Sequence, residues 1–293
     1  MSDLKQFSND PSSSSPWPLA ALILSSVLLA FGPVLVRLSD TGPVAAAFWR
    51  MALAAPVLLL VALWTQRGRG LKPAALPWGL AILSGLFFAA DLATWHLGIV
   101  RTSIANATLF GNTAAFMLAG WSILVKGQHP GASTLKALAL AGAGTLLLLG
   151  TSAQLSPKHL AGDALSLLAA AFYTGYLIVV MGLRDRLPTS VVLAMSTLAS
   201  VMFLLPAALI EPGSIWPADW RPVIALAITS QLVGQGLMVF ASGRLPAPVI
   251  GVGLLVQPMV SAAAGWLLFG EVLGPLELAG ATMVLAALVL IRR

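Results

Sequence analysis

Long apolar runs separated by short polar connections recur along the whole chain. Each run holds roughly 17 to 24 residues, enough for a helix to cross about 30 Å of hydrocarbon. The connections carry glycine, proline or charge, which favour turns in water over continued helix. The pattern predicts ten transmembrane helices, at residues 17–38, 43–64, 76–99, 102–125, 133–150, 160–183, 189–210, 220–242, 246–269 and 275–291.

Composition supports lipid as the solvent for most of this surface. Hydrophobic residues make up 58% of the 293 positions and charged residues only 9%, against about 25% in an average soluble domain. The absence of cysteine excludes disulfides and thiolate metal sites. No nucleotide-binding loop, metal motif or catalytic constellation is visible. We therefore expect an all-α integral membrane protein that is not an enzyme and has no cofactor.

The basic residues predict the orientation. With the N-terminus in the cytoplasm, eleven fall in cytoplasmic segments: Lys5, Arg67, Arg69, Lys72, Lys126, Lys136, Arg184, Arg186, Arg244, Arg292 and Arg293. Four fall on the other side: Arg37, Arg101, Lys158 and Arg221. The positive-inside rule then places both termini in the cytoplasm, and we expect the membrane to be a bacterial inner membrane. The same distribution explains the net charge of +6 without a nucleic-acid partner. Residues 1–16 are polar and predict a disordered cytoplasmic tail.

The second part of the chain resembles the first. Gly120-Trp121 matches Gly265-Trp266 at an offset of 145 positions, and Pro130 matches Pro275 at the same offset. Chance similarity between helices rich in alanine, glycine and leucine is the alternative. The repeat predicts two domains of five helices, 17–150 and 160–293. Because five is odd, the second would lie inverted in the membrane, an arrangement typical of transporters.

Several short motifs resemble a known family: Leu245-Pro246-Ala247-Pro248, Gln257-Pro258, Trp266, Gly270-Glu271, Ala279-Gly280-Ala281 and Phe48-Trp49-Arg50. They are similar to those of EamA-type proteins of the drug/metabolite transporter superfamily, and most like the aromatic amino acid exporters. The resemblance implies a proton- or gradient-driven exporter of amino acids, related metabolites or toxic cations. The first half has Thr113 and Lys126 where the second has Pro258 and Glu271. Roles tied to that proline or glutamate are therefore carried only to the second half.

Two charges inside predicted spans are the most informative polar residues. Charge within a membrane is costly and usually functional. Asp91 and Arg50 lie at similar depths in consecutive spans, each roughly 12 Å from the outer end at 1.5 Å per residue. Asp91 is predicted to bind a substrate ammonium or a proton. The alternatives are a structural ion pair between the two, or an Arg50 that extends outward to the interface.

Further polar and aromatic positions complete the predicted site. The substrate-binding residues are predicted to be Asp91, Trp95, Asn106, Phe110, Tyr173, Gln231, Gln235 and Gln257, and the structural or gating residues Arg50, Pro258 and Trp266. The polar members have interhelical hydrogen bonding as their alternative role, and the aromatic members have core packing. Pro258 removes a backbone donor, which predicts a hinge there. Pro33 and Pro56 predict a hinge or a simple kink.

Together these features predict a monomeric carrier that moves a small-molecule substrate through a central cavity by alternating access. The predicted partners are that substrate, a coupled proton and the lipid bilayer. The expected cargo is amino acids, with aromatic ones among the candidates, or related metabolites. An exporter of toxic organic cations or drugs, or a membrane channel, are the alternatives.

Overall fold

The computed structural model describes residues 16–67, 76–127, 130–150, 157–260, 263 and 274–290. Within these ranges the regular structure is entirely helical. The predicted tail, except for Pro16, and Trp266 lie outside the described residues, so those predictions stay untested.

The helices follow the predicted apolar runs closely. In chain order they are α1 (Trp17–Leu29), α2 (Gly32–Leu38), α3 (Pro43–Thr65), α4 (Trp78–Ile99), α5 (Ile104–Gly111), α6 (Ala114–Leu124), α7 (Ala132–Gly150), α8 (Leu160–Arg184), α9 (Thr189–Ile210), α10 (Arg221–Ala225), the π-helix η3 (Leu226–Gln235), α11 (Gly236–Ser242), α12 (Ala247–Leu254) and α14 (Pro275–Leu290). Within the described chain, seven segments are long and apolar enough to cross a membrane, and three shorter apolar helices accompany them.

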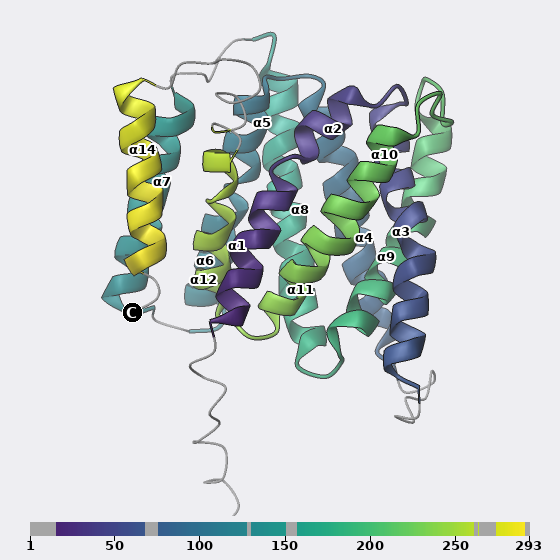
Figure 1. The fold of residues 1–293 in the computed structure, drawn as a ribbon, viewed down its shortest axis with the longest axis horizontal. Helices are drawn as coiled ribbons and strands as arrows, with labels where there is room; N and C mark the ends of the chain where they lie inside the picture. The colour runs from purple at the N-terminus through teal and green to yellow at the C-terminus, as the bar shows by residue number, and fades with distance from the viewer. Residues whose placement is uncertain are drawn as a thin grey trace, which may run out of the picture.

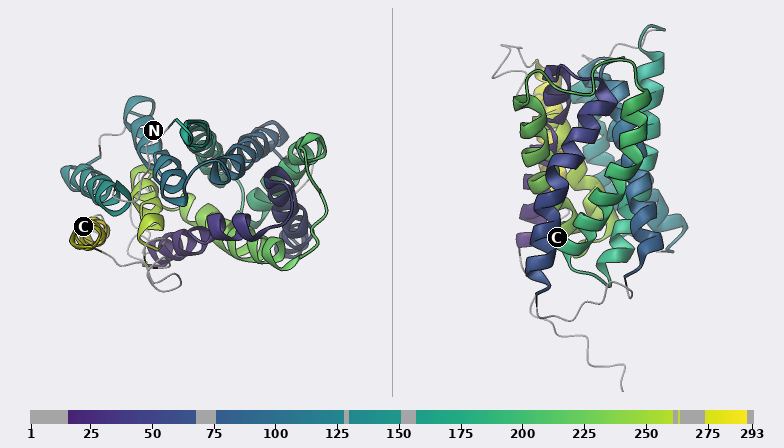
Figure 2. Two further views of the ribbon diagram at one scale, coloured as in Figure 1. Left: turned by 90° about the horizontal axis from the view of Figure 1, so that it is seen from above. Right: turned by 90° about the vertical axis from the view of Figure 1, so that its right-hand side faces the viewer.

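The helices form an elongated bundle in which successive long segments run in opposite directions (Figure 1). α4 packs against α8, α9 and α3. α7 and α14 pack against each other at one side of the bundle (Figure 2). The N-terminal end of α1 and the C-terminal end of α14 lie at the same end, the lower one in Figure 1.

Local sequence explains many helix boundaries. Pro43 stands in the first turn of α3, where a missing N–H costs nothing. The side chain of Ser103 caps α5 by accepting a hydrogen bond from the backbone N–H of Asn106. Gly213, in the connection after α9, has φ 131°, a conformation that side chains disfavour. These residues help to fix where the spans begin and end.

Three of the apolar runs are interrupted near mid-length. The first breaks between α1 and α2, where Pro33 has no N–H to offer the carbonyl of Leu29. The second breaks between α5 and α6. There Asn112 donates its side-chain N–H to the carbonyl of Thr108 at 2.8 Å, and Thr113 donates its hydroxyl to Phe110 at 2.5 Å. Such side-chain bonds compete with the helical ladder.

The third break lies just before the predicted hinge. α12 ends at Leu254, residues 255–256 form a turn, and residues 257–260 are again helical. Pro258 cannot donate to the carbonyl one turn back, which is that of Leu254. The helix is therefore interrupted where Pro258 predicts it. Pro56, in contrast, lies inside the uninterrupted α3. That the helix bends at this break, as a hinge would, remains a prediction.

A π-helix occupies the middle of the run that begins at Arg221. In η3 the backbone is wider than in an α-helix, so that Gly234 lies close to Thr229, five residues earlier. A Cβ on Gly234 would lie 2.8 Å from the carbonyl oxygen of Thr229. The Gly234 carbonyl accepts a hydrogen bond from Ser25 of α1 at 2.8 Å. π-helical turns often mark functional sites. η3 ends at Gln235, a residue of the predicted site.

Candidate functional site

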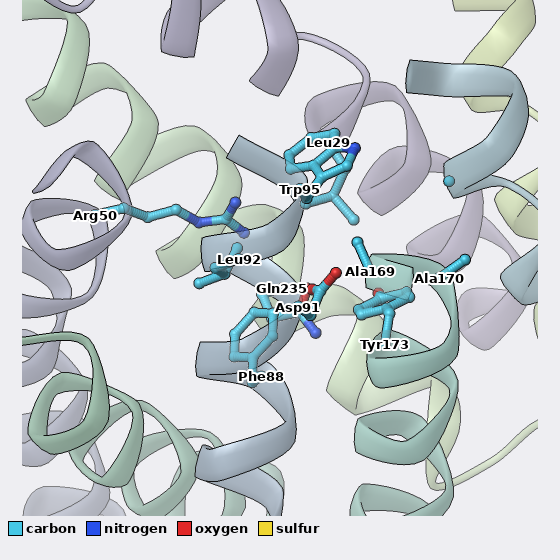
Figure 3. A pocket seen from close by; sticks show the side chains of 11 residues that line it. Leu29, Arg50, Phe88, Asp91, Leu92, Trp95, Ala169, Ala170, Tyr173 and Gln235 are labelled. Atoms are coloured by element: carbon cyan, nitrogen blue, oxygen red, sulfur yellow. The ribbon is translucent and has the colours of Figure 1, made fainter. Parts of the chain in front are cut away.

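A small cavity lies inside the bundle where α1, α3, α4, α5, α8 and η3 meet. Its volume is about 70 Å³, room for roughly two water molecules. The residues that line it are Leu29, Arg50, Phe88, Asp91, Leu92, Trp95, Gly111, Ala169, Ala170, Tyr173 and Gln235 (Figure 3). Five predicted site residues therefore meet at one cavity: Arg50, Asp91, Trp95, Tyr173 and Gln235.

Asp91 carries the negative charge of this cavity. Its residue surface is 8% exposed, and α4 presents its side chain to the cavity between Trp95 and Phe88 (Figure 3). Within the described chain its carboxylate has no hydrogen-bond donor and no ion pair. Apart from the backbone bonds of α4, Asp91 receives one hydrogen bond, from the Thr94 hydroxyl to its backbone carbonyl at 3.1 Å. The carboxylate is thus available to a ligand.

Arg50 carries the positive charge. It is 2% exposed and reaches the cavity from α3 (Figure 3). Its Nε has no hydrogen-bond partner, and its guanidinium lies 5.8 Å from the centroid of the Phe88 ring. The ion pair with Asp91, one of the alternatives for these two residues, does not form within 4 Å. Of the residues that the structure describes, only Arg221 and Asp219 form a salt bridge.

Aromatic rings surround the two charges. Phe88 stacks on Tyr176 with ring centroids 4.3 Å apart, and Tyr173 stacks on Tyr176 at 5.9 Å. Trp95 packs between two backbone positions without side chains: a Cβ on Gly32 would lie 3.1 Å from the Trp95 ring, and one on Gly111 would lie 3.5 Å from its Nε1. Both glycines flank helix breaks, so Trp95 contacts the interrupted segments of the bundle directly.

Uncharged polar groups of the cavity are also without partners. Gln235 lies beside the hydroxyls of Tyr173 and Tyr176. Neither hydroxyl makes a hydrogen bond of normal distance and angle in the described part of the chain, although Ser196 also lies beside Tyr176, and the side-chain nitrogen of Gln235 makes none either. We refer to Arg50, Asp91, Tyr173 and Gln235 as the cavity cluster. Its members can donate and accept hydrogen bonds that the protein itself leaves unmade.

The other four predicted substrate-binding residues lie outside the cavity lining. Asn106 is fully buried and donates to Asp163 at 2.8 Å. Gln231 is also fully buried and donates to Thr197 at 2.9 Å, although its carbonyl oxygen is unpartnered. Phe110 precedes the lining residue Gly111 in α5, and Gln257 follows the break after α12. Their predicted substrate contacts are not brought to the cavity in this conformation.

A second polar cluster, not predicted from the sequence, lies near one end of the bundle. Asp163 of α8 is 6% exposed and accepts from the Thr102 hydroxyl at 2.6 Å and from Asn106. Arg37 donates to the backbone carbonyls of Ile99, the last residue of α4, and of Thr102, at 2.9 and 2.7 Å. We refer to Arg37, Thr102, Asn106 and Asp163 as the end cluster. It joins α2, α4, α5 and α8 through satisfied bonds.

Small and apolar cavity residues were missed as well. Phe88 and Leu92 belong to the face of α4 that carries Asp91 and Trp95, so the helical spacing of three or four residues contained the signal. Leu29, Gly111, Ala169 and Ala170 carry no chemical signal of their own. No group of three or more metal-ligating side chains occurs within the described ranges.

Comparison with known proteins decides the family. The model of the EamA-like transporter family matches residues 16–150 and again residues 160–293. This chain belongs to the EamA-like transporter family. The family prediction made from its motifs is thereby confirmed, and the apolar helices are those of a multi-pass membrane protein.

Relatives of this EamA-like protein are named as exporters. The pseudopaline exporter CntI of Pseudomonas aeruginosa is 24% identical over 285 residues, covering 94% of this chain and 95% of CntI. The threonine/homoserine exporter RhtA of Escherichia coli is 29% identical over 153 residues, half of each chain. The family and these names indicate membrane transport and not catalysis. They do not test the predicted likeness to aromatic amino acid exporters.

A solved structure has the same fold. A crystal structure matches with a TM-score of 0.77 and 18% sequence identity, over 96% of this chain and 97% of the other. At that identity the match establishes the fold alone.

Proposed function

We propose that this EamA-like protein is a secondary transporter that exports amino acids or related small metabolites across a bacterial inner membrane. The observation that carries the proposal is the cavity cluster. Arg50 and Asp91 lie buried inside a membrane protein, and neither forms a salt bridge within the described chain. Intramembrane charges of that kind mark substrate or ion pathways, and the cluster lies where six helical elements converge.

The proposed architecture is ten spans in two inverted halves of five helices. The segments of the second half begin about 145 residues after their counterparts in the first, as α3 and α9 do, and α7 and α14. These two pairs of counterparts also pack against each other, as elements that lie beside a two-fold axis in the membrane plane would do. The shared end of α1 and α14 supports two termini in the cytoplasm (Figure 1).

Alternating access is the proposed mechanism. A cavity of about 70 Å³ is too small for an amino acid, so binding requires the surrounding helices to separate. Leu29 and Gly111 line the cavity at the ends of α1 and α5, beside two helix breaks. Broken helices at mid-membrane are how many transporters build a substrate site. We propose that the cavity widens at these breaks.

The named relatives support the direction and the class of cargo. CntI exports pseudopaline and RhtA exports threonine and homoserine, by their names. Trp95, Phe88 and Tyr173 provide aromatic surface at the cavity of this chain, which suits aromatic side chains. The transporter is proposed to act as a monomer in the lipid bilayer, with a proton as the coupled ion and Asp91 as the acceptor of that proton or of the substrate ammonium.

Reconstitution tests the function. The purified full-length protein is placed in liposomes with a panel of labelled amino acids, with and without a pH gradient. We expect saturable, gradient-stimulated transport and exchange with unlabelled substrate from the opposite side. Folded protein that moves none of the amino acids would contradict the proposed cargo. Flux that neither saturates nor exchanges would support a channel and contradict alternating access.

Export of organic cations is the second candidate. Asp91 among aromatic rings is a favourable environment for a desolvated cation, which supports this interpretation. Arg50 at the same cavity opposes it, because a second cation would be repelled. The same liposomes separate the two: a membrane-impermeant organic cation such as methyl viologen moves, and amino acids do not, if the cation hypothesis holds.

A further inference from the structure

Arg50 and Asp91 face one cavity without forming an ion pair with each other. No nitrogen of one lies within 4 Å of an oxygen of the other, because such a pair would be a salt bridge, and the single salt bridge of the described chain lies elsewhere. Both side chains are nonetheless at least nine-tenths buried. Two unpaired charges of opposite sign in a membrane interior lower the stability of the protein. A ligand that forms an ion pair with both charges would therefore gain binding free energy from each of them.

The contacts of each charge show what is missing. Arg50 has the face of Phe88 beside it and no acceptor for its Nε. A planar guanidinium binds a carboxylate with two parallel hydrogen bonds. Within the described chain Asp91 has no donor to its carboxylate, whereas buried Asp163 accepts two hydrogen bonds on one oxygen. Asp91 therefore requires a donor such as an ammonium, and Arg50 requires an acceptor such as a carboxylate.

We propose that Arg50 and Asp91 are the two poles of a zwitterion site, so that the substrate binds with its α-carboxylate at Arg50 and its α-ammonium at Asp91. This inference rests on the proposed transport function and makes it more specific. It requires both charges on one small molecule, which distinguishes free α-amino acids from amines, organic cations and simple carboxylic acids.

The rest of the cavity supports this orientation. The unpartnered amide nitrogen of Gln235 and the hydroxyl of Tyr173 are hydrogen-bonding groups for the two ends of a zwitterion. Ala169, Ala170 and Gly111 leave one wall with small side chains. Trp95 provides an apolar surface beside them (Figure 3). The third substituent of the α-carbon is expected to lie against this wall when the cavity widens.

Binding of three matched ligands to the purified full-length protein tests the two poles. The probes are phenylalanine, phenethylamine, which lacks the carboxylate, and 3-phenylpropionate, which lacks the ammonium. Wild-type protein should bind phenylalanine about 10- to 100-fold more tightly than either analogue. This ratio is the usual contribution of a charge-assisted hydrogen bond to affinity. The comparison is repeated for a small side chain with threonine, with 1-amino-2-propanol, which lacks the carboxylate, and with 3-hydroxybutyrate, which lacks the ammonium.

Variants assign each pole. Arg50→Gln should bind phenylalanine no better than phenethylamine, and Asp91→Asn should bind it no better than 3-phenylpropionate. Asp163→Asn removes a buried carboxylate outside the cavity and should keep the wild-type preference. Arg50→Lys and Asp91→Glu keep the charges and should retain part of the selectivity, which guards against variants that fail to fold.

The outcomes separate this inference from the proposed function. Equal binding of the amino acid and its analogues, with amino acid transport intact, overturns the zwitterion site alone. The zwitterion site is also overturned if Arg50→Gln and Asp91→Asn weaken the binding of all three ligands equally. That result is expected if the two residues form a structural pair bridged by water. If folded protein neither binds nor transports any amino acid of either series, both the inference and the amino acid function fall.

Discussion

The end cluster and the cavity cluster contain the same kinds of residue. Each has one arginine, one aspartate, one side-chain amide and one hydroxyl group, drawn from several helices of the same bundle. In the end cluster Asp163 accepts from Thr102 and Asn106, and Arg37 donates to two backbone carbonyls. In the cavity cluster Arg50, Tyr173 and Gln235 each have an atom without a partner in the described chain, and Asp91 has no donor there to its carboxylate.

This difference separates structural polarity from binding polarity. Satisfied interhelical bonds in a membrane contribute about 1 kcal/mol each and hold helices together. Unsatisfied buried groups cost stability and are retained where a ligand completes them. The residue types do not distinguish the two clusters. The number of hydrogen bonds that their side chains already make within the protein does.

The largest expected effect comes from replacing the two aspartates with asparagine. Asp91→Asn should lower the transport rate about 100-fold, because a substrate ammonium loses its counter-charge, while the folded protein is no less stable. Asp163→Asn should instead lower stability by about 1 kcal/mol and leave transport per folded molecule unchanged. Liposome flux and thermal unfolding in detergent measure the two. Loss of transport in Asp163→Asn at full stability would remove the distinction between the clusters.

The arginines offer a smaller contrast. Arg37→Gln removes the donor to the carbonyls of Ile99 and Thr102 and should lower the free energy of unfolding by about 1 kcal/mol. Arg50→Gln removes a buried cation that has no ion-pair partner in the described chain, so the free energy of unfolding should stay equal or rise. Fluorescence-detected thermal unfolding of both variants beside wild type provides the measurement. A larger loss of stability in Arg50→Gln than in Arg37→Gln would assign Arg50 a structural role.

The smallest effect concerns the packing of Trp95 at the edge of the cavity cluster. A Cβ on Gly32 would lie 3.1 Å from the Trp95 ring, so Gly32→Ala should displace the ring and weaken substrate binding about two- to fivefold. Gly79 lies in the first turn of α4 and outside the cavity lining, and a Cβ there would meet nothing within 4 Å, so Gly79→Ala should bind as wild type does. Titration of binding for both variants tests this. Equal effects would show that Trp95 adjusts freely.

Much of the cavity could be anticipated from depth and residue type. Asp91, Arg50, Trp95, Tyr173 and Gln235 were predicted and do meet at one cavity, because intramembrane charge rarely lacks a purpose. Asn106 carries the same polar signal but is bonded to Asp163, and Gln231 is bonded to Thr197. Polarity in a span indicates that a partner is required, not whether that partner is protein or ligand.

By itself the sequence determined which segments are helical and apolar, to within a few residues at most boundaries. It also determined the break before Pro258 and the family. These follow from local causes: hydrophobic length, helix-ending residues and a missing N–H. Only the tertiary structure decided that η3 winds as a π-helix, that Arg50 and Asp91 share a cavity without pairing, and which polar groups find partners. Those outcomes depend on how helices distant in sequence approach one another, since a hydrogen bond exists only when packing brings both of its atoms within reach.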